Sequence, residues 1–463
     1  MNILLIACPK LEWMQESKGT IPVSLLYLAA VLRRSGFYVH ILDLSISKSE
    51  NATDLFDGLM LKINNAVSDI DPAIIGFNCF VSQHLPFIMR VSKQLRKTMP
   101  KVHITIGGAH PSIFYKDILT NSPEIDSVIV GEGEEQIVEL ANCIEKRKPD
   151  FQTIHSFAYR VNGNVVYNKR NGYISDLDKL PDPAWDIINF PDYFSDHSSW
   201  HNPKQHDIKI SAPIITSRSC PFSCNFCACH KTMGRGFRKR SPKRVVGEIE
   251  HIHRTYGINY FGFIDDNVNL DKNHVMEICE EIIRRRLDIQ FEPTCGLHLA
   301  SMDDDIAKAL SKAGCVFARL PIEHGNEYIR NKVIGKNLKR EQIFSAAKSL
   351  RKYGMRISTM SIMGFPEDTM QTLQDTYDLL MELKADLNYV FNLIPFPGTK
   401  LFNQAKEEGL LLSNFSEEQI WQGDIDLDPV QKIQQYYLKP KNMSIEELDY
   451  FRNKFNEIQI MNS

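Results

Sequence analysis

The sequence lacks the features of several protein classes. Its 463 residues contain no apolar run long enough to cross a membrane, and Met1–Lys10 has a short apolar stretch without a charged start or a cleavage site. Net charge is also small, because 54 Lys and Arg face 57 Asp and Glu. A polybasic nucleic-acid-binding surface and a disordered acidic chain are therefore both disfavoured. We expect a soluble, cytoplasmic protein with no membrane span and no nucleic-acid partner.

Cysteine is scarce as well. The chain has 10 cysteines, too few and too unevenly spaced for a disulfide framework. Hydrophobic residues make up 43% and charged residues 24%, which is average for a globular protein, and the length suffices for two or three domains with their own cores. Four of the cysteines fall within ten residues, Cys220–Cys229, and we expect the chemistry there.

Residues 1–145 predict an open, parallel α/β domain of the Rossmann-like, doubly wound kind, because short β-rich runs alternate with helical patterns. The predicted strands are Asn2–Ala7, Tyr38–Asp43, Ala73–Phe77, His103–Ile106 and Ser127–Val130. Glycines follow two of these strands, at Gly107-Gly108 and at Gly131 and Gly133. Each could simply form a tight turn. Because ligands of such sheets bind outside the carboxyl ends of the strands, two such turns favour a ligand crevice.

The rest of the chain predicts a linker, a second α/β domain and a tail. Residues 146–205 are predicted to be a linker with a hairpin at Tyr159–Val166, and residues 401–463 a mostly helical appendage. Between them, residues 206–400 alternate strands and helices. The predicted strands are Ile214–Ser219, Tyr260–Ile264, Ile289–Thr294, Val316–Pro321, Arg356–Met363 and Asn388–Ile394. Six such units favour a partial (β/α)6 TIM-like barrel, with chemistry at the carboxyl ends of its strands.

Three cysteines follow the first of these strands with the spacing CxxxCxxC: Cys220, Cys224 and Cys227. Zn²⁺ would need a fourth ligand, which Cys229 or His230 could supply only awkwardly from so short a turn. A [4Fe–4S] cluster held by three cysteines instead leaves one iron open for a substrate. The spacing favours this second interpretation, and a structural zinc loop is the alternative.

This pattern resembles the radical S-adenosylmethionine (SAM) superfamily, in which CxxxCxxC follows the first strand of a partial barrel and an aromatic residue, here Phe226, precedes the last cysteine. The resemblance implies that Cys220, Cys224 and Cys227 hold the cluster, and that Cys229 is not a ligand. It also implies that the open iron binds SAM and that an electron from the cluster cleaves SAM to a 5′-deoxyadenosyl radical.

Polar groups at other strand ends are predicted to complete the SAM site. Together with Phe226, the predicted SAM contacts are Asp265, Asp266, Glu323, Met363 and Gly364. A carboxylate suits the SAM ammonium group, although a solvated rim charge is the alternative for each acidic residue. For Cys295 and His298, a satisfied polar group at the barrel mouth is a better explanation than catalysis.

The front domain resembles the cobalamin (B12)-binding domain that precedes the barrel in one class of radical SAM enzymes. The resemblance lies in Thr20–Ala30, Gly107–Pro111 and Val130–Glu134. The DxHxxG motif, whose histidine ligates cobalt in other corrinoid proteins, is absent, so the loop Asn78–Phe80 would face the lower side of cobalt. The implied cobalamin contacts are Thr20, Pro22, Asn78, Cys79, Phe80, Gly107, Gly108, Gly131, Glu132 and Gly133.

The resemblance implies a cobalamin-dependent methyltransferase that acts on an unactivated carbon or phosphorus centre through a 5′-deoxyadenosyl radical and methylcobalamin. An oxidative cyclase or ring-rearranging enzyme with the same cofactors is the alternative, and a corrinoid or redox sensor is the non-enzymatic one. A methylthiotransferase is disfavoured, because Cys8, Cys79 and Cys143 should not converge as a second triad. The implied partners are a small-molecule or natural-product substrate and an electron donor such as flavodoxin or ferredoxin.

Overall fold

The computed structural model describes residues 1–10, 20–47, 55–146, 150–194, 210–423 and 435–459. The chain forms two compact units. We call the first the front unit; it comprises Met1–Phe194, Lys231–Met233 and Ser416–Leu427. The second, the barrel unit, comprises Ser195–His230, Gly234–Phe415 and Asp428–Ser463.

A seven-stranded sheet forms the centre of the front unit. Its strands are β1 (Asn2–Ala7), β2 (Tyr38–Asp43), β3 (Ile74–Asn78), β4 (His103–Gly107), β5 (Ser127–Ile129), β6 (Phe157–Val161) and β7 (Asn164–Asn168). They lie in the order β2-β1-β3-β4-β5-β6-β7, and the pairs among β1 to β5 are parallel. The predicted parallel, Rossmann-like sheet is confirmed.

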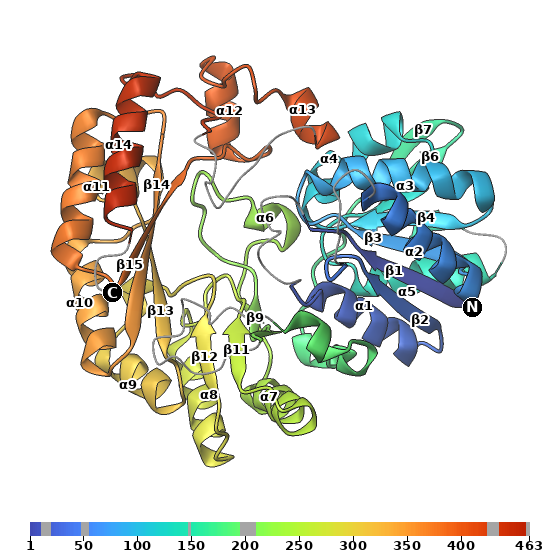
Figure 1. Ribbon diagram of the computed structural model, residues 1–463, viewed down its shortest axis with the longest axis horizontal. Helices are drawn as coiled ribbons and strands as arrows, with labels where there is room; N and C mark the ends of the chain where they lie inside the picture. The colour runs from blue at the N-terminus through green and yellow to red at the C-terminus, as the bar shows by residue number, and fades with distance from the viewer. Residues whose placement is uncertain (11–19, 48–54, 147–149, 195–209, 424–434, 460–463) are drawn as a thin grey trace. The chain divides into compact units, whose positions relative to one another are not determined.

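Helices cover both faces of this sheet (Figure 1). They are α1 (Val23–Arg34), α2 (Leu55–Ile70), α3 (His84–Thr98), α4 (Ala109–Asn121) and α5 (Glu134–Glu145). Helix α1 buries Leu25, Ala29 and Leu32, one stripe of its surface, in the same core as Ile3 and Leu5 of β1. Because the strands are parallel, the crossover helices leave their carboxyl ends together at one edge.

The hairpin predicted within the linker belongs to this sheet. Strand β6 pairs antiparallel with both β5 and β7, and the turn residues Asn162 and Gly163 both adopt positive φ, as a two-residue hairpin turn requires. The front unit therefore runs beyond residue 145, to Phe194. Residues 147–149 and 195–205 of the predicted linker lie outside the described residues.

Three histidines of the front unit, His103 and His110 buried and His84 half-buried, should make it sensitive to acid. Burial lowers the pKa of His84, His103 and His110 to about 4. A histidine whose folded pKa lies below its unfolded value of 6.5 contributes stability above pH 6.5 that is lost as the pH falls toward 4. At pH 5 we expect each to lower the free energy of unfolding by about 2 kcal/mol relative to pH 7.5.

Denaturant unfolding at the two pH values measures this loss. His103→Asn should reduce the pH dependence by about one histidine's share, roughly 2 kcal/mol. A variant whose stability falls with pH as steeply as that of the wild type would contradict the prediction.

The barrel unit contains six parallel strands in chain order. They are β8 (Ala212–Ile214), β11 (Tyr260–Phe263), β12 (Gln290–Pro293), β13 (Phe317–Glu323), β14 (Arg356–Met363) and β15 (Leu387–Asn392). Ladders join β8, β11 and β12, and separately β13, β14 and β15, while a parallel bridge between Phe291 and Cys315 connects the two sets. Within the described residues no ladder joins β15 to β8. The predicted partial six-unit barrel is confirmed.

A helix follows each barrel strand. The helices of this part of the chain are α6 (Cys229–Thr232), α7 (Pro242–Tyr256), α8 (Lys272–Arg284), α9 (Asp304–Lys312), α10 (Arg340–Lys352), α11 (Met370–Leu383), α12 (Lys400–Glu407), α13 (Glu417–Gln422) and α14 (Ile445–Glu457). Helices α12, α13 and α14 confirm the predicted helical C-terminal region. Among the described residues, no helix is both long and apolar enough to cross a membrane.

The first barrel strand is shorter than the predicted Ile214–Ser219. Strand β8 ends at Ile214, and β9 (Ser217–Arg218) pairs antiparallel with β10 (Arg238–Lys239) instead. The buried carboxylate of Asp265 accepts the backbone N–H of Thr216 at 3.0 Å and that of Ser217. The two backbone N–H groups therefore donate to a carboxylate at this point instead of to a neighbouring strand. As a result the barrel strand ends before the cysteines.

Candidate functional site

The three cysteines of the CxxxCxxC pattern lie on one loop between β9 and α6, which we call the cysteine loop (residues 219–228). Cys220, Cys224 and Cys227 are half-buried, and none forms a disulfide. The backbone of Asn225 fixes the loop from two sides: its N–H donates to Ile334 O at 3.0 Å, and its carbonyl accepts from Leu401 N at 3.1 Å. Elements far along the chain therefore hold this turn.

Ser219, the first residue of the cysteine loop, and Glu323, at the end of β13, adopt a backbone conformation with positive φ that residues other than glycine rarely adopt. Ser219 has φ +76°, and Glu323 has φ +66°. The hydroxyl of Ser219 donates to Gly234 O at 2.7 Å, and Glu323 ends β13 at a register shift after Pro321. Because such strain persists where surrounding structure fixes it, often at functional sites, both residues mark this end of the barrel as a candidate site.

The thiols of the loop match a soft metal centre. Burial raises the pKa of Cys220 and Cys227 and raises that of Cys224 to about 11, while the cation of Lys336 acts in the opposite direction on Cys224. The side-chain amide of Asn267 donates to Cys220 Sγ at 3.1 Å. Thiols of this kind keep their protons until a metal displaces them. By donor type, three thiolates on one loop suit an iron–sulfur cluster with one open iron. Among the described residues no three His, Cys, Asp or Glu side chains are arranged to hold a metal ion, so the cluster assignment stays a prediction.

Cys229 has a different environment. Its thiol donates to Asp266 Oδ2 at 3.2 Å, and burial together with that carboxylate raises its pKa. This thiol is therefore engaged with a carboxylate. That Cys229 is not a cluster ligand stays a prediction.

The two neighbouring aspartates have separate environments. Asp265 is 1% exposed, and its carboxylate also accepts from the hydroxyls of Thr216 at 2.8 Å and Ser217 at 2.6 Å. Burial raises its pKa to about 6, and these hydrogen bonds lower it. Asp265 is thus occupied in shaping the chain before the cysteine loop, whereas Asp266 is exposed. Of the pair, Asp266 is the one open to a ligand, and its contact with SAM stays a prediction.

Glu323 faces a cation that the sequence pattern did not reveal. Lys336 Nζ donates to Glu323 Oε1 at 2.7 Å. Burial lowers the pKa of Lys336, but Glu323 and the thiols of Cys224 and Cys220 outweigh it and raise that pKa. Lys336 follows the π-helical turn Ile329–Val333, 13 residues after Glu323. No local motif signals this pairing.

The ends of β13 and β14 are joined by one buried carboxylate. Asp368 Oδ2 accepts the backbone N–H groups of Gly364 and Phe365, each at 2.8 Å, and Oδ1 lies 3.0 Å from His324 Nε2. Asp368 and His324 are fully buried. Asp368 therefore fixes the turn, with φ +96° at Gly364, that follows the predicted SAM contact Met363. Met363 itself is 1% exposed.

Three other predicted residues lie around the same strand ends. Phe226 packs edge-on against Phe365, with ring centroids 6.3 Å apart. The ring of His298 stacks on that of Phe222, with centroids 4.9 Å apart, and its Nδ1 lies 2.9 Å from Ser301 Oγ. His298 therefore has a hydrogen-bond partner within the protein, as expected for a structural polar residue. The thiol of Cys295 lies 3.7 Å from Ile264 O.

In the front unit, hydrogen bonds connect the loops at the carboxyl edge of the sheet. Asn78 Nδ2 donates to Ser24 Oγ at 3.1 Å, and Cys79 N donates to Gly107 O at 2.8 Å. Gly108 has φ +116°, and a Cβ there would lie 2.5 Å from Cys79 O. Only glycine permits this approach. Phe80, in the same loop, is 68% exposed.

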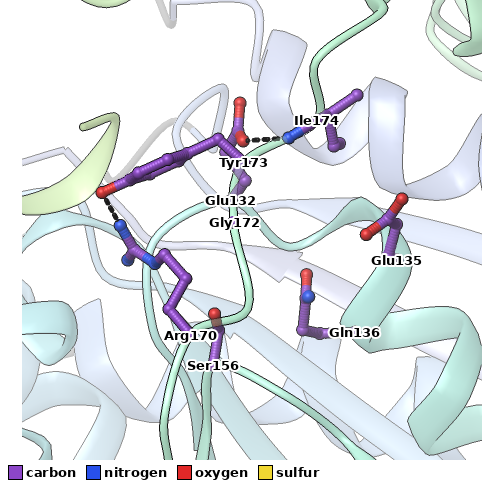
Figure 2. Close-up of a pocket in the computed structure, with 8 residues that line it drawn as sticks. All are labelled: Glu132, Glu135, Gln136, Ser156, Arg170, Gly172, Tyr173 and Ile174. Carbon is purple, nitrogen blue, oxygen red and sulfur yellow. Dashed lines mark hydrogen bonds between the residues drawn. The ribbon is translucent and has the colours of Figure 1, made fainter. Parts of the chain in front are cut away.

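The next loop, after β5, contacts protein rather than open solvent. A Cβ on Gly131 would lie 2.1 Å from Arg170 Nη2 and 2.8 Å from Thr232 O. Glu132 is 8% exposed and accepts from Ile174 N at 3.1 Å. Figure 2 shows the small polar pocket beside it, with Arg170 pointing to the hydroxyl of Tyr173. Residues 170–174 thus line this part of the edge, and no motif in the sequence indicated them.

The remaining predicted cobalamin contacts surround the same edge. Thr20 is exposed and Pro22 half-buried, just before α1, and Gly133 immediately precedes α5. Their contact with cobalamin, like that of the other front-unit residues, stays a prediction. A further element also lies here: His110 Nε2 is 3.1 Å from Trp421 O, so α13 packs on α4.

Comparison with known proteins identifies the two units. Residues 214–380 match the model of the radical SAM superfamily, and residues 18–141 match that of the B12 binding domain. The chain therefore contains a region that matches the radical SAM superfamily and, before it in the sequence, a region that matches the B12 binding domain.

Among the individual relatives, some are named methyltransferases and others cyclases. An uncharacterized methyltransferase of Pyrococcus horikoshii is 27% identical, over 94% of this chain and 89% of the relative. An anaerobic magnesium-protoporphyrin IX monomethyl ester cyclase of Rubrivivax gelatinosus is 24% identical, over 83% of this chain and 66% of the relative. The solved structure of the methyltransferase TsrM from Kitasatospora setae, with cobalamin and a [4Fe–4S] cluster bound, has a TM-score of 0.74 and 18% identity, over 97% and 84% of the two chains. At this identity the likeness shows the fold.

Proposed function

We propose that this chain is a cobalamin-dependent radical SAM methyltransferase that methylates an unactivated carbon or phosphorus centre. The observation that carries the proposal is the cysteine loop: three thiols outside any disulfide, held where the first barrel strand ends. When bound, a [4Fe–4S] cluster supplies the electron that cleaves SAM, and cobalamin carries the methyl group. The B12-binding domain and the methyltransferase relatives support this reading.

Residues around the loop have distinct tasks in this proposal. Cys220, Cys224 and Cys227 hold the cluster, and the amide of Asn267 hydrogen-bonds the sulfur of Cys220. Asp266 offers an exposed carboxylate to the SAM ammonium group. Asp368 acts indirectly, because it orients the backbone of Gly364.

The proposal includes partners and a compartment. We expect a small-molecule substrate, and a one-electron donor protein such as flavodoxin or ferredoxin. Half-buried cluster thiols suit a reducing compartment, so we place the protein in the cytoplasm.

Product counting separates the proposal from its alternatives. The reconstituted protein is incubated without oxygen with SAM, dithionite and a metabolite extract of the source cell. A methyltransferase should form S-adenosylhomocysteine and 5′-deoxyadenosine in similar amounts. An oxidative cyclase, which the second relative favours, should form 5′-deoxyadenosine without S-adenosylhomocysteine. A sensor should form neither, and that result would refute the enzymatic proposal.

A further inference from the structure

The strands β11 to β14 (Figure 1) carry four polar residues on positions that precede the strand ends described above: Tyr260, Glu292, Arg319 and Ser358. Arg319 of β13 and Ser358 of β14 are register partners, so they share a face of the sheet. Glu292 of β12 lies 3.4 Å from Arg319 across the neighbouring strands. The outward residues Ala318 and Leu320 are fully buried on the side where α10 packs.

Tyr260 of β11 belongs to the same group. It shares a strand face with Gly262, the register partner of Glu292. Burial raises its pKa, as does the charge of Glu292, while the charge of Arg319 lowers it. Tyr260 also packs in one buried cluster with Phe317, which lies two residues before Arg319 on β13 and so shares its strand face. Because β11 and β13 belong to different sheets, this packing places the group inside the curve of the barrel. We call Tyr260, Glu292, Arg319 and Ser358 the lumen group.

Three polar atoms of the lumen group are buried without a hydrogen-bond partner in the described part of the chain: Tyr260 Oη, Arg319 Nε and Ser358 Oγ. Tyr260 is 1% exposed and Ser358 is 0% exposed. A single buried polar atom without a partner costs about 1–3 kcal/mol. Three donors left open in one place therefore indicate a site that a ligand completes.

The chemistry of the group selects the ligand. Three hydrogen-bond donors, one of them on a cation, suit a carboxylate. Beside a carboxylate the acidic Glu292 would be repelled, unless the ligand also carries a cation next to its anion. An α-amino-acid group has that arrangement.

We propose that the lumen group binds the amino-acid end of the substrate, with its carboxylate on Arg319, Tyr260 and Ser358 and its ammonium group on Glu292. This assignment rests on the proposed function, because it names the substrate class of that reaction. Arg319 precedes Glu323 by four residues, roughly 13 Å along the strand. The substrate therefore extends from the lumen group toward the strand ends, as an amino acid with a large side chain does.

Binding measurements test this without turnover. Calorimetry under anaerobic conditions uses L-tryptophan and L-phenylalanine as probes, with the matched amines (tryptamine, phenethylamine) and acids (indole-3-propionate, 3-phenylpropionate). We expect the amino acids to bind about tenfold or more tightly than analogues lacking either charge. Failure of both amino acids to bind the wild type at millimolar concentration overturns the assignment.

Variants distinguish a ligand site from a structural one. Tyr260→Phe and Ser358→Ala remove hydroxyls that have no hydrogen-bond partner among the described residues, so we expect an unchanged or higher melting temperature together with several-fold weaker binding. Arg319→Gln should weaken binding by about tenfold or more, while Lys348→Gln, an exposed change on α10, should leave it unchanged.

Unchanged binding in Tyr260→Phe, Ser358→Ala and Arg319→Gln overturns the proposal. SAM cleavage by the wild type with dithionite, measured without any amino acid, is scored separately. Its failure would count against the proposed function, while the binding result would still decide the ligand class.

Discussion

Alanine at any one of Cys220, Cys224 or Cys227 is expected to reduce SAM cleavage to background. The same substitution should remove the iron–sulfur absorbance at about 400 nm. The physical reason is the number of sulfurs. A cluster with one open iron has three protein ligands, and the described structure offers no fourth thiol in the same bonding state, since Cys229 is engaged with Asp266. Iron content, absorbance and 5′-deoxyadenosine are measured after anaerobic reconstitution with dithionite and SAM.

Cys229→Ala is the matched control, because it removes a thiol only two residues from Cys227. We expect this variant to retain its iron and its absorbance. Loss of iron from Cys229→Ala would show that the ligand set is wrong, and retention of both iron and SAM cleavage in a triple variant of the other three would refute the site. Zinc in place of iron in the wild type would favour the alternative interpretation, in which the cysteine loop is a structural zinc site.

The second large effect is expected at a buried ion pair that contacts the segment between β8 and β9. Arg240 and Glu248 lie 2.5 Å apart, with side chains 4% and 1% exposed. Arg240 also donates to Ile215 O at 2.9 Å, in the segment between β8 and β9. Glu248→Ala leaves the guanidinium buried without its carboxylate, at an expected cost of about 3–5 kcal/mol. We expect the melting temperature to fall by roughly 10 °C.

An exposed pair provides the comparison. Arg340 and Glu382 form an ion pair whose side chains are 41% and 59% exposed. Because water screens such a pair, Glu382→Ala should change stability by less than about 1 kcal/mol. Differential scanning fluorimetry of both variants measures the difference. Equal shifts in the two variants would contradict the role of burial.

The sequence predicted the parts of this protein whose signal is local. Alternating strand and helix patterns located the parallel strands of both units, and the spacing of Cys220, Cys224 and Cys227 indicated the loop on which the candidate site is proposed. The first barrel strand was predicted too long, because its break depends on Asp265, which lies almost 50 residues further along the chain. Adjacent aspartates look alike in a sequence, and only burial separates the tasks of Asp265 and Asp266.

Interactions between distant segments could not be predicted. Lys336 reaches Glu323 after a π-helical turn, and Asp368 reaches His324 across 44 residues. The lumen group draws its members from four strands, each of which appears in the sequence as an ordinary barrel strand. Charged residues in such strands become informative once strand register shows which of them share a face.

The packing of α13 on α4 within the front unit has a consequence for how the protein is made. His110 meets the carbonyl of Trp421, and a Cβ on Gly423 would lie 2.1 Å from Ser82 O, so a segment more than 200 residues downstream completes this fold. During synthesis the first 194 residues emerge without that partner, so the contact between His110 and the Trp421 carbonyl can form only after Trp421 has left the ribosome. The order of translation therefore postpones the last step of front-unit assembly until most of the barrel has been synthesised.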